Sequence, residues 1–71
     1  MVQANRFVLA EDFILRVAAE TGKDYSHVIY ELQDNEIELI DDLFRLQPAD
    51  FSALGFSIAL KNRVMALKEQ Y

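Results

Sequence analysis

The chain has 71 residues, 52% of them apolar, and carries seven Lys and Arg against twelve Asp and Glu, for a net charge of −5. This length allows one domain, and the composition is typical of a globular chain rather than a disordered one. The acidic balance argues against non-specific binding to nucleic acid or anionic lipid, which both attract cationic surfaces.

The low content of turn-forming residues favours an all-α fold, because two glycines and one proline are too few for many short strands. Cysteine is absent, so no disulfide or thiolate metal site can stabilise the core. The apolar runs are far shorter than the roughly 18 residues of a membrane span, and no signal-peptide pattern is present. We therefore expect an intracellular protein, cytoplasmic or nuclear, without membrane association.

A helical domain over residues 10–71 is expected after an N-terminal extension over residues 1–9, which shows no clear periodicity. The first helix is predicted over residues 10–21, where apolar side chains recur on one face. Gly22 can supply the left-handed residue that ends it.

Three short helices are expected next. The first of them begins near Asp24 or Ser26, either of which can cap it, and ends at residues 34–35. The other two are predicted over residues 39–44 and 48–54, the latter with proline at its first position.

The last and longest helix is predicted from the cap Ser57 to about Gln70. Its apolar stripe consists of Leu60, Val64, Leu67 and Tyr71. The opposite, solvent side would hold Ile58, Asn62 and Met65, flanked by Lys61. Ile58 could instead pack at the start of the helix, and Met65 could be an isolated surface residue. The chain is thus predicted to form a compact all-α bundle of five helices.

The charge is unevenly distributed along the chain. Residues 31–50 hold seven acidic side chains and one basic one, a net charge of about −6. Residues 51–71 hold three basic side chains and one acidic one, about +2. These segments could simply be solvated helix faces, or they could allow one copy to dock on another.

An enzymatic function is not expected. His27 is the only histidine, and no serine stands in a Gly-x-Ser-x-Gly context. A calcium loop starting at Asp34 would need glycine at its sixth position and glutamate at its twelfth, where Leu39 and Arg45 stand. We therefore expect no catalytic residue, no metal and no cofactor.

Nucleic-acid binding through the last helix is disfavoured by the acidic balance but is kept as the alternative function. The cations available are Lys61, Arg63 and Lys68, which would give weak and salt-sensitive binding.

Residues 25–70 resemble a sterile alpha motif (SAM) domain. The run Asp50-Phe51-Ser52-Ala53-Leu54-Gly55-Phe56 is similar to the family signature D-L-x-x-L-G-I, and residues 32–37 resemble its F-x-x-N-x-I turn. The chain departs from the pattern in lacking tryptophan and in having Lys61-Asn62-Arg63 where the family has Gly-His-Arg.

The resemblance implies a non-enzymatic module in a scaffold or signalling protein that associates with itself or with another SAM-like domain, forming homo- or hetero-oligomers. Some SAM domains recognise RNA or DNA hairpins, so the resemblance gives the alternative function the form of hairpin binding by the last helix. More often, such domains join head to tail through two surfaces. The implied mid-loop surface consists of Asp34, Glu36, Glu38, Asp41, Asp42 and Asp50. The implied end-helix surface consists of Ser57, Ile58, Lys61, Asn62, Arg63 and Met65. They coincide with the acidic segment and with the basic, apolar side of the last helix.

Overall fold

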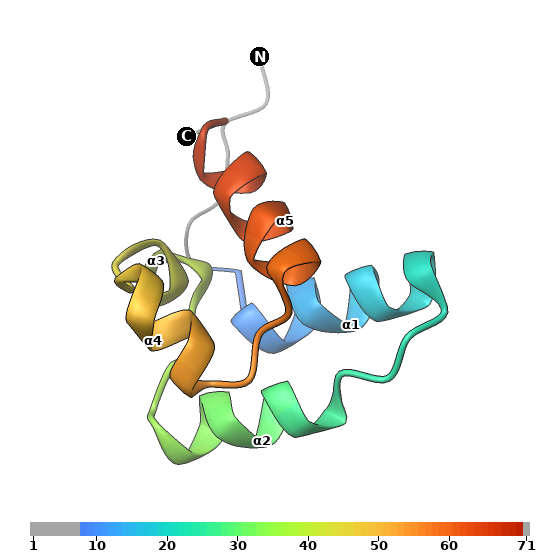
Figure 1. Ribbon diagram of the computed structural model, residues 1–71, viewed down its shortest axis with the longest axis horizontal. Helices are drawn as coiled ribbons and strands as arrows, with labels where there is room; N and C mark the ends of the chain where they lie inside the picture. Colours follow the sequence, from blue (N-terminus) through green and yellow to red (C-terminus); the bar gives the residue numbers. More distant parts are fainter. Residues whose placement is uncertain (1–7, 71) are drawn as a thin grey trace.

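Five helices joined by short connections make up the computed structural model, which describes residues 8–70 (Figure 1). They are α1 (Ala10–Thr21), α2 (Ser26–Asp34), α3 (Ile40–Phe44), α4 (Pro48–Ala53) and α5 (Ile58–Lys68). α1 packs against α2 and α3, and α3 packs against α5. Residues 8–70 contain no strand, so the predicted all-α bundle of five helices is confirmed.

The helix boundaries follow the predicted residues at the end of α1 and the start of α5, whereas the N-cap of α2 is Tyr25 rather than the predicted Asp24 or Ser26. Gly22 ends α1 with φ at 72°, and its N–H donates to the Ala18 carbonyl. The Ser57 hydroxyl oxygen accepts the Leu60 N–H at 3.1 Å and so caps α5. α5 ends two residues earlier than predicted, at Lys68, and with 11 residues it is one shorter than α1.

Fifteen buried apolar side chains form the core, and among residues 8–70 no polar or charged side chain is buried. They are Ala10, Phe13, Ile14, Val17, Tyr25, Val28, Leu32, Ile40, Leu43, Phe44, Phe51, Leu54, Phe56, Leu60 and Val64. Of the stripe predicted for the last helix, Leu60 and Val64 are fully buried and Leu67 is half-buried. Tyr71 lies outside the described residues.

Met65 differs from its predicted position on the solvent side of the last helix. It is half-buried and packs against the core. α5 therefore contacts the rest of the bundle over a wider arc than the predicted apolar stripe alone would give.

The start of the described chain pairs with the segment before α3. The Ile40 N–H donates to the Val8 carbonyl at 2.9 Å, and the Ala10 N–H donates to the Glu38 carbonyl at 2.8 Å. Leu9 and Leu39 form an isolated antiparallel bridge between these bonds. The pairing holds the α2–α3 connection beside the beginning of α1.

A tight turn at Gly55 positions the start of α5. Gly55 has φ at 83°, and the Phe56 N–H donates to the Phe51 carbonyl at 3.0 Å. The Phe51 and Phe56 rings pack edge to face with centroids 5.1 Å apart. Ile58 follows this turn at the first position of α5.

Candidate interaction surfaces

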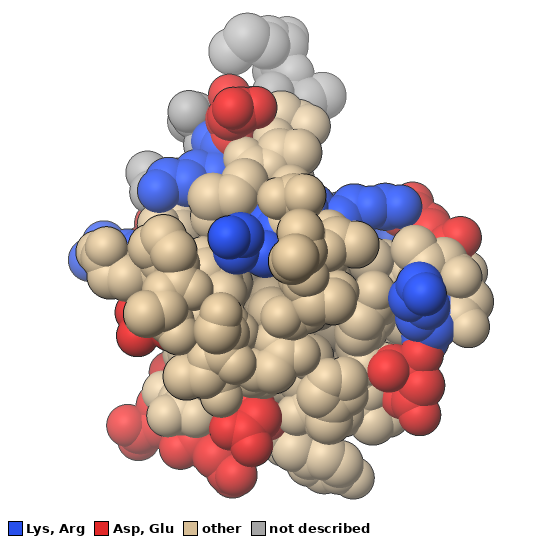
Figure 2. Space-filling view, in the orientation of Figure 1, with Lys and Arg blue, Asp and Glu red and all other residues tan. Residues whose placement is uncertain are grey.

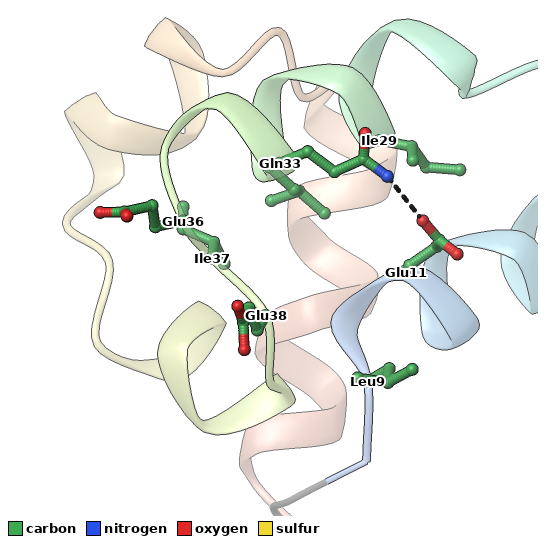
Figure 3. Close-up of a pocket in the computed structure, with 8 residues that line it drawn as sticks. Leu9, Glu11, Ile29, Gln33, Glu36, Ile37 and Glu38 are labelled. Carbon is green, nitrogen blue, oxygen red and sulfur yellow. Dashed lines mark hydrogen bonds between the residues drawn. The ribbon is translucent and has the colours of Figure 1, made fainter.

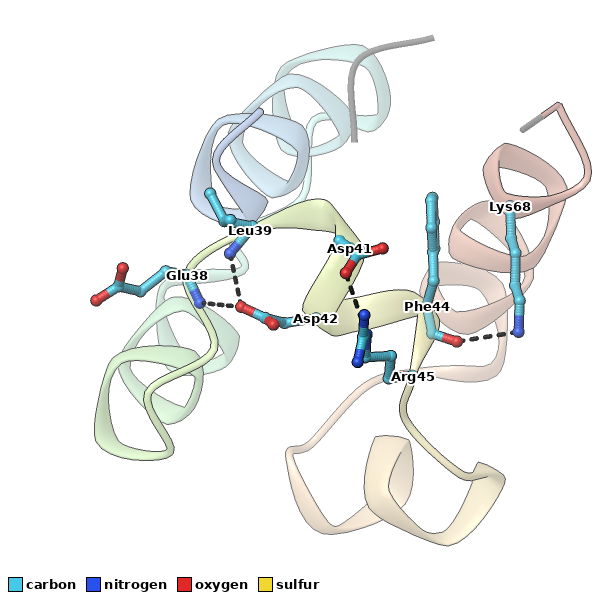
Figure 4. A network of polar contacts seen from close by, with 7 residues as sticks. All are labelled: Glu38, Leu39, Asp41, Asp42, Phe44, Arg45 and Lys68. Atoms are coloured by element: carbon cyan, nitrogen blue, oxygen red, sulfur yellow. Dashed lines mark hydrogen bonds and ion pairs between the residues drawn. The ribbon is translucent and has the colours of Figure 1, made fainter. Parts of the chain in front are cut away.

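Two of the six mid-loop carboxylates stabilise helix starts within their own chain. The Asp42 carboxylate accepts the Leu39 N–H at 3.2 Å and the Glu38 N–H at 3.3 Å, at the beginning of α3 (Figure 4). The Asp50 carboxylate accepts the Gln47 N–H at 2.9 Å at the beginning of α4. These bonds satisfy N–H groups that a helix start leaves without a partner.

Three of the other four mid-loop residues are more available, whereas Asp41 is largely covered and paired. Asp41 forms an ion pair with Arg45 one turn later, at 3.1 Å between Oδ2 and Nε (Figure 4). Asp34, Glu36 and Glu38 are exposed, and their carboxylates make no hydrogen bond or ion pair with residues 8–70. The acidic residues able to meet a partner directly are therefore concentrated at the end of α2 and in the connection that follows.

An apolar groove of about 290 Å³ lies beside this connection, between the start of α1 and the end of α2 (Figure 3). We call it the acid-lined groove; its residues are Leu9, Glu11, Ile29, Leu32, Gln33, Glu36, Ile37 and Glu38. Gln33 Nε2 donates to Glu11 Oε1 at 3.0 Å, whereas the Glu36 carboxylate points away from this pair (Figure 3). The groove can accept an apolar side chain whose neighbours are basic.

Six of the groove residues were not among the predicted site residues: Leu9, Glu11, Ile29, Leu32, Gln33 and Ile37. Glu11 is in the first turn of α1, where an acid also favours the positive end of the helix. The contact of Glu11 with Gln33 depends on how α1 packs against α2, and no local sequence pattern encodes that packing. Leu9 is nearly half exposed although apolar, a signal that only the structure reveals.

Ile58 is the most prominent feature of the end-helix surface. Its relative exposure is 77%, the highest among the exposed large apolar residues of the described chain. The expectation that it packs at the start of α5 is therefore wrong. Lys61 lies one turn later on the same side of the helix and is half-buried, and Asn62 is exposed.

Arg63 does not share this side of α5. Its Nη1 lies 3.0 Å from Oε1 of Glu20 in α1, and both side chains are about half exposed. Lys68 is on the Lys61 side, and its ammonium group donates to the Phe44 carbonyl at 2.9 Å (Figure 4). The basic residues of the last helix are therefore divided between two flanks.

The surface charges are only partly separated in space. On the face drawn in Figure 2, an acidic group gathers at the lower edge and basic side chains lie mainly in the upper half around α5, but acidic and basic side chains also lie together at the right edge and at the top. Opposite charges on different parts of one molecule can guide two copies into one relative orientation.

Comparisons with protein families, with curated proteins and with solved structures return no match to this chain. In the described part of the chain, no helix is long and apolar enough to cross a membrane. Residues 8–70 also hold no group of three or more His, Cys, Asp or Glu side chains that could bind a metal ion.

Proposed function

We propose that this chain is a SAM-like protein association module in which the end-helix surface of one molecule meets an acidic surface on another copy or on a second SAM-like domain. The observation that carries the proposal is the exposed Ile58, which stands at the start of α5 beside Lys61. Covering this side chain with a partner's apolar surface would remove its apolar area from water, which is favourable.

The acid-lined groove is the surface of this chain that best complements Ile58. Its apolar residues would surround the isoleucine, and Glu11 and Glu38 at its edge would attract Lys61. Two unlike surfaces make a heterologous contact, so repetition of this contact would produce open helical polymers or closed rings. An intracellular scaffold or signalling protein is the setting that such a module fits.

Hairpin recognition by the last helix is less well supported. It would need Lys61, Arg63 and Lys68 together, but Arg63 is paired with Glu20 on the other flank of α5. Only two of the three cations then remain on one face, too few for strong phosphate binding by an acidic chain.

The test is analytical ultracentrifugation of the purified chain over a range of concentrations at low and high salt. We expect association at tens of micromolar that weakens as salt screens the charged contacts. A chain that remains monomeric at high micromolar concentration and low salt would exclude self-association, and the proposal would then require a different SAM-like partner.

The variant Ile58→Asp should abolish the association. Burial of an isoleucine side chain is worth about 1.5–3 kcal/mol, so its loss corresponds to at least a tenfold weaker contact. Leu15→Asp is the matched control, because Leu15 is another exposed large apolar residue, about half exposed, but lies on α1, outside both surfaces.

A further inference from the structure

A second concave feature lies between the α3–α4 segment and α5, with a volume of about 500 Å³. We call it the cationic cleft. Arg45 from the end of α3 and Lys61 and Lys68 from α5 line it, so it contains three of the seven basic residues of the chain. No acidic residue is among its described lining, although the chain has twelve acids.

About half of the surface that lines the cleft is apolar, and Gln47 and Asn62 contribute neutral polar groups. Leu46 and Met65 are half-buried and Pro48 is exposed, so all three present surface to the cleft. A small inorganic anion would leave this apolar surface in water. A ligand that uses the whole cleft needs carboxylates and at least one apolar side chain.

The positions of the cations suggest the shape of such a ligand. Lys61 and Lys68 are seven residues apart on α5, which is two turns or about 10.5 Å along the helix axis. An extended peptide covers this distance in about three residues. Because successive side chains of an extended peptide point to opposite faces, two acidic residues four positions apart, with an apolar residue midway, present all three side chains to one face and could reach both ammonium groups and Met65.

The cations keep enough freedom to bind a ligand. The Arg45 side chain is 76% exposed, and Asp41 occupies its Nε. The Lys68 ammonium group donates one hydrogen bond to the Phe44 carbonyl, which fixes it at the edge of the cleft and leaves two further N–H donors.

We propose that the cationic cleft binds an extended acidic peptide segment of a partner protein that carries apolar residues between its acids. The peptide would lie along α5 between Lys61 and Lys68, with Arg45 opposite. Arg45 and Lys68 belong to this site alone, whereas Ile58 belongs to the association surface, so the two sites can be tested separately.

The experiment is a fluorescence anisotropy titration of the full chain with a labelled peptide of about twelve residues in which a leucine follows each pair of glutamates. We expect saturable binding that weakens at high salt. Arg45→Glu and Lys68→Glu should each weaken binding at least tenfold, and Lys68→Arg should restore it. Lys23→Glu, which makes the same charge change in the exposed α1–α2 connection, should bind as the wild type does.

Circular dichroism of each variant checks that the fold is retained. If Lys68→Glu unfolds the chain, Arg45→Glu still tests the proposal, because the Arg45 side chain is largely exposed. Equal binding by Arg45→Glu and wild type would overturn the proposal. So would undiminished binding of a peptide with serine in place of leucine, because the apolar walls would then play no part. Tighter binding of an RNA hairpin that displaces the peptide would also overturn it.

Discussion

At the scale of single residues, the two glycines occupy left-handed positions in different surroundings. Gly22 has φ at 72°, and a Cβ atom there would meet nothing within 4 Å. Gly55 has φ at 83°, and its Cβ would lie 3.2 Å from Cδ2 of His27. His27 also bonds through Nε2 to the Gly55 carbonyl at 3.2 Å. The only histidine of the chain therefore packs over the turn that leads into α5.

Alanine substitution at the two glycines should separate backbone strain from steric contact. Gly22→Ala should lower the free energy of unfolding by about 1 kcal/mol, the cost of a left-handed alanine. Gly55→Ala should cost more, about 1–2 kcal/mol, since the imidazole must also move. Urea unfolding measures both values. In a His27→Ala background the two glycine substitutions should cost the same, and a persistent difference would contradict this account.

Asp24 contributes to the stability of the folded chain by an amount that depends on pH. The Ser26 hydroxyl, and then the Ser26 N–H, donate to its carboxylate and lower the pKa of Asp24 below its ordinary value. Because the pKa is lower in the folded state, the stabilisation exists above the unfolded pKa of about 3.9 and disappears as pH falls through the folded value.

Asp24→Ala should therefore destabilise the chain at pH 7 more than at pH 2.5, as measured by urea unfolding at both pH values. Asp24→Asn is the control, because it removes the same titrating charge but keeps a hydrogen-bond acceptor; it should destabilise the chain less than Asp24→Ala and show the same change between the two pH values. An Asp24→Ala effect that is equal at both pH values would show that the carboxylate charge contributes nothing.

At the scale of elements, short helices depend on their end contacts. α3 has five residues and α4 has six, too few to be stable alone. Each has an aspartate at its third position whose carboxylate accepts a backbone N–H just before the helix. Asp42 and Asp50 both belong to the acidic segment that the sequence predicted to be a binding surface, and in the structure both bond to the backbone at the start of a helix.

Alanine substitution can distinguish the capping aspartates from the exposed acids. Asp42→Ala and Asp50→Ala should each lower the unfolding free energy by about 1 kcal/mol, the usual value of such a cap. Asp34→Ala should change it by less than about 0.5 kcal/mol, because Asp34 is exposed at the end of α2. Thermal unfolding of the three variants measures this, and equal effects would contradict the assignment of roles.

The elements were predictable from sequence because their boundaries are local. Gly22, Pro48 and Ser57 mark helix ends through their own backbone and side-chain chemistry, and all three stand where the sequence placed them. The roles of the charged residues were less predictable. A carboxylate near a short helix can cap it or face solvent, and sequence spacing does not separate Asp42 from Glu38.

Contacts between distant segments could not be predicted at all. The Glu11–Gln33 bond joins residues 22 positions apart, and the Arg63–Glu20 pair joins residues 43 positions apart. Both depend on how α1 packs against its neighbours. The Glu11–Gln33 bond joins two residues that line the acid-lined groove. The Arg63–Glu20 pair holds Arg63 on the flank of α5 that faces α1, away from Ile58.

At the scale of the whole molecule, the net charge of −5 is the sum of unlike surfaces. Three cations line the cleft beside α5, and acids line the groove between α1 and α2. The exposed Ile58 lies one turn before Lys61 of the cationic cleft, and its side chain complements the acid-lined groove. Association through such surfaces would also stabilise a small domain by mass action, because the associated form is the folded form.

The most direct test of the association mechanism is a mixing experiment in the analytical ultracentrifuge. Ile58→Asp keeps the groove intact, and the double variant Glu11→Lys, Glu38→Lys keeps the end-helix surface intact. Each variant alone should sediment as a monomer, and an equimolar mixture at low salt should form a dimer that grows no further. A mixture that remains monomeric, under conditions where the wild type associates, would contradict the contact between Ile58 and the acid-lined groove.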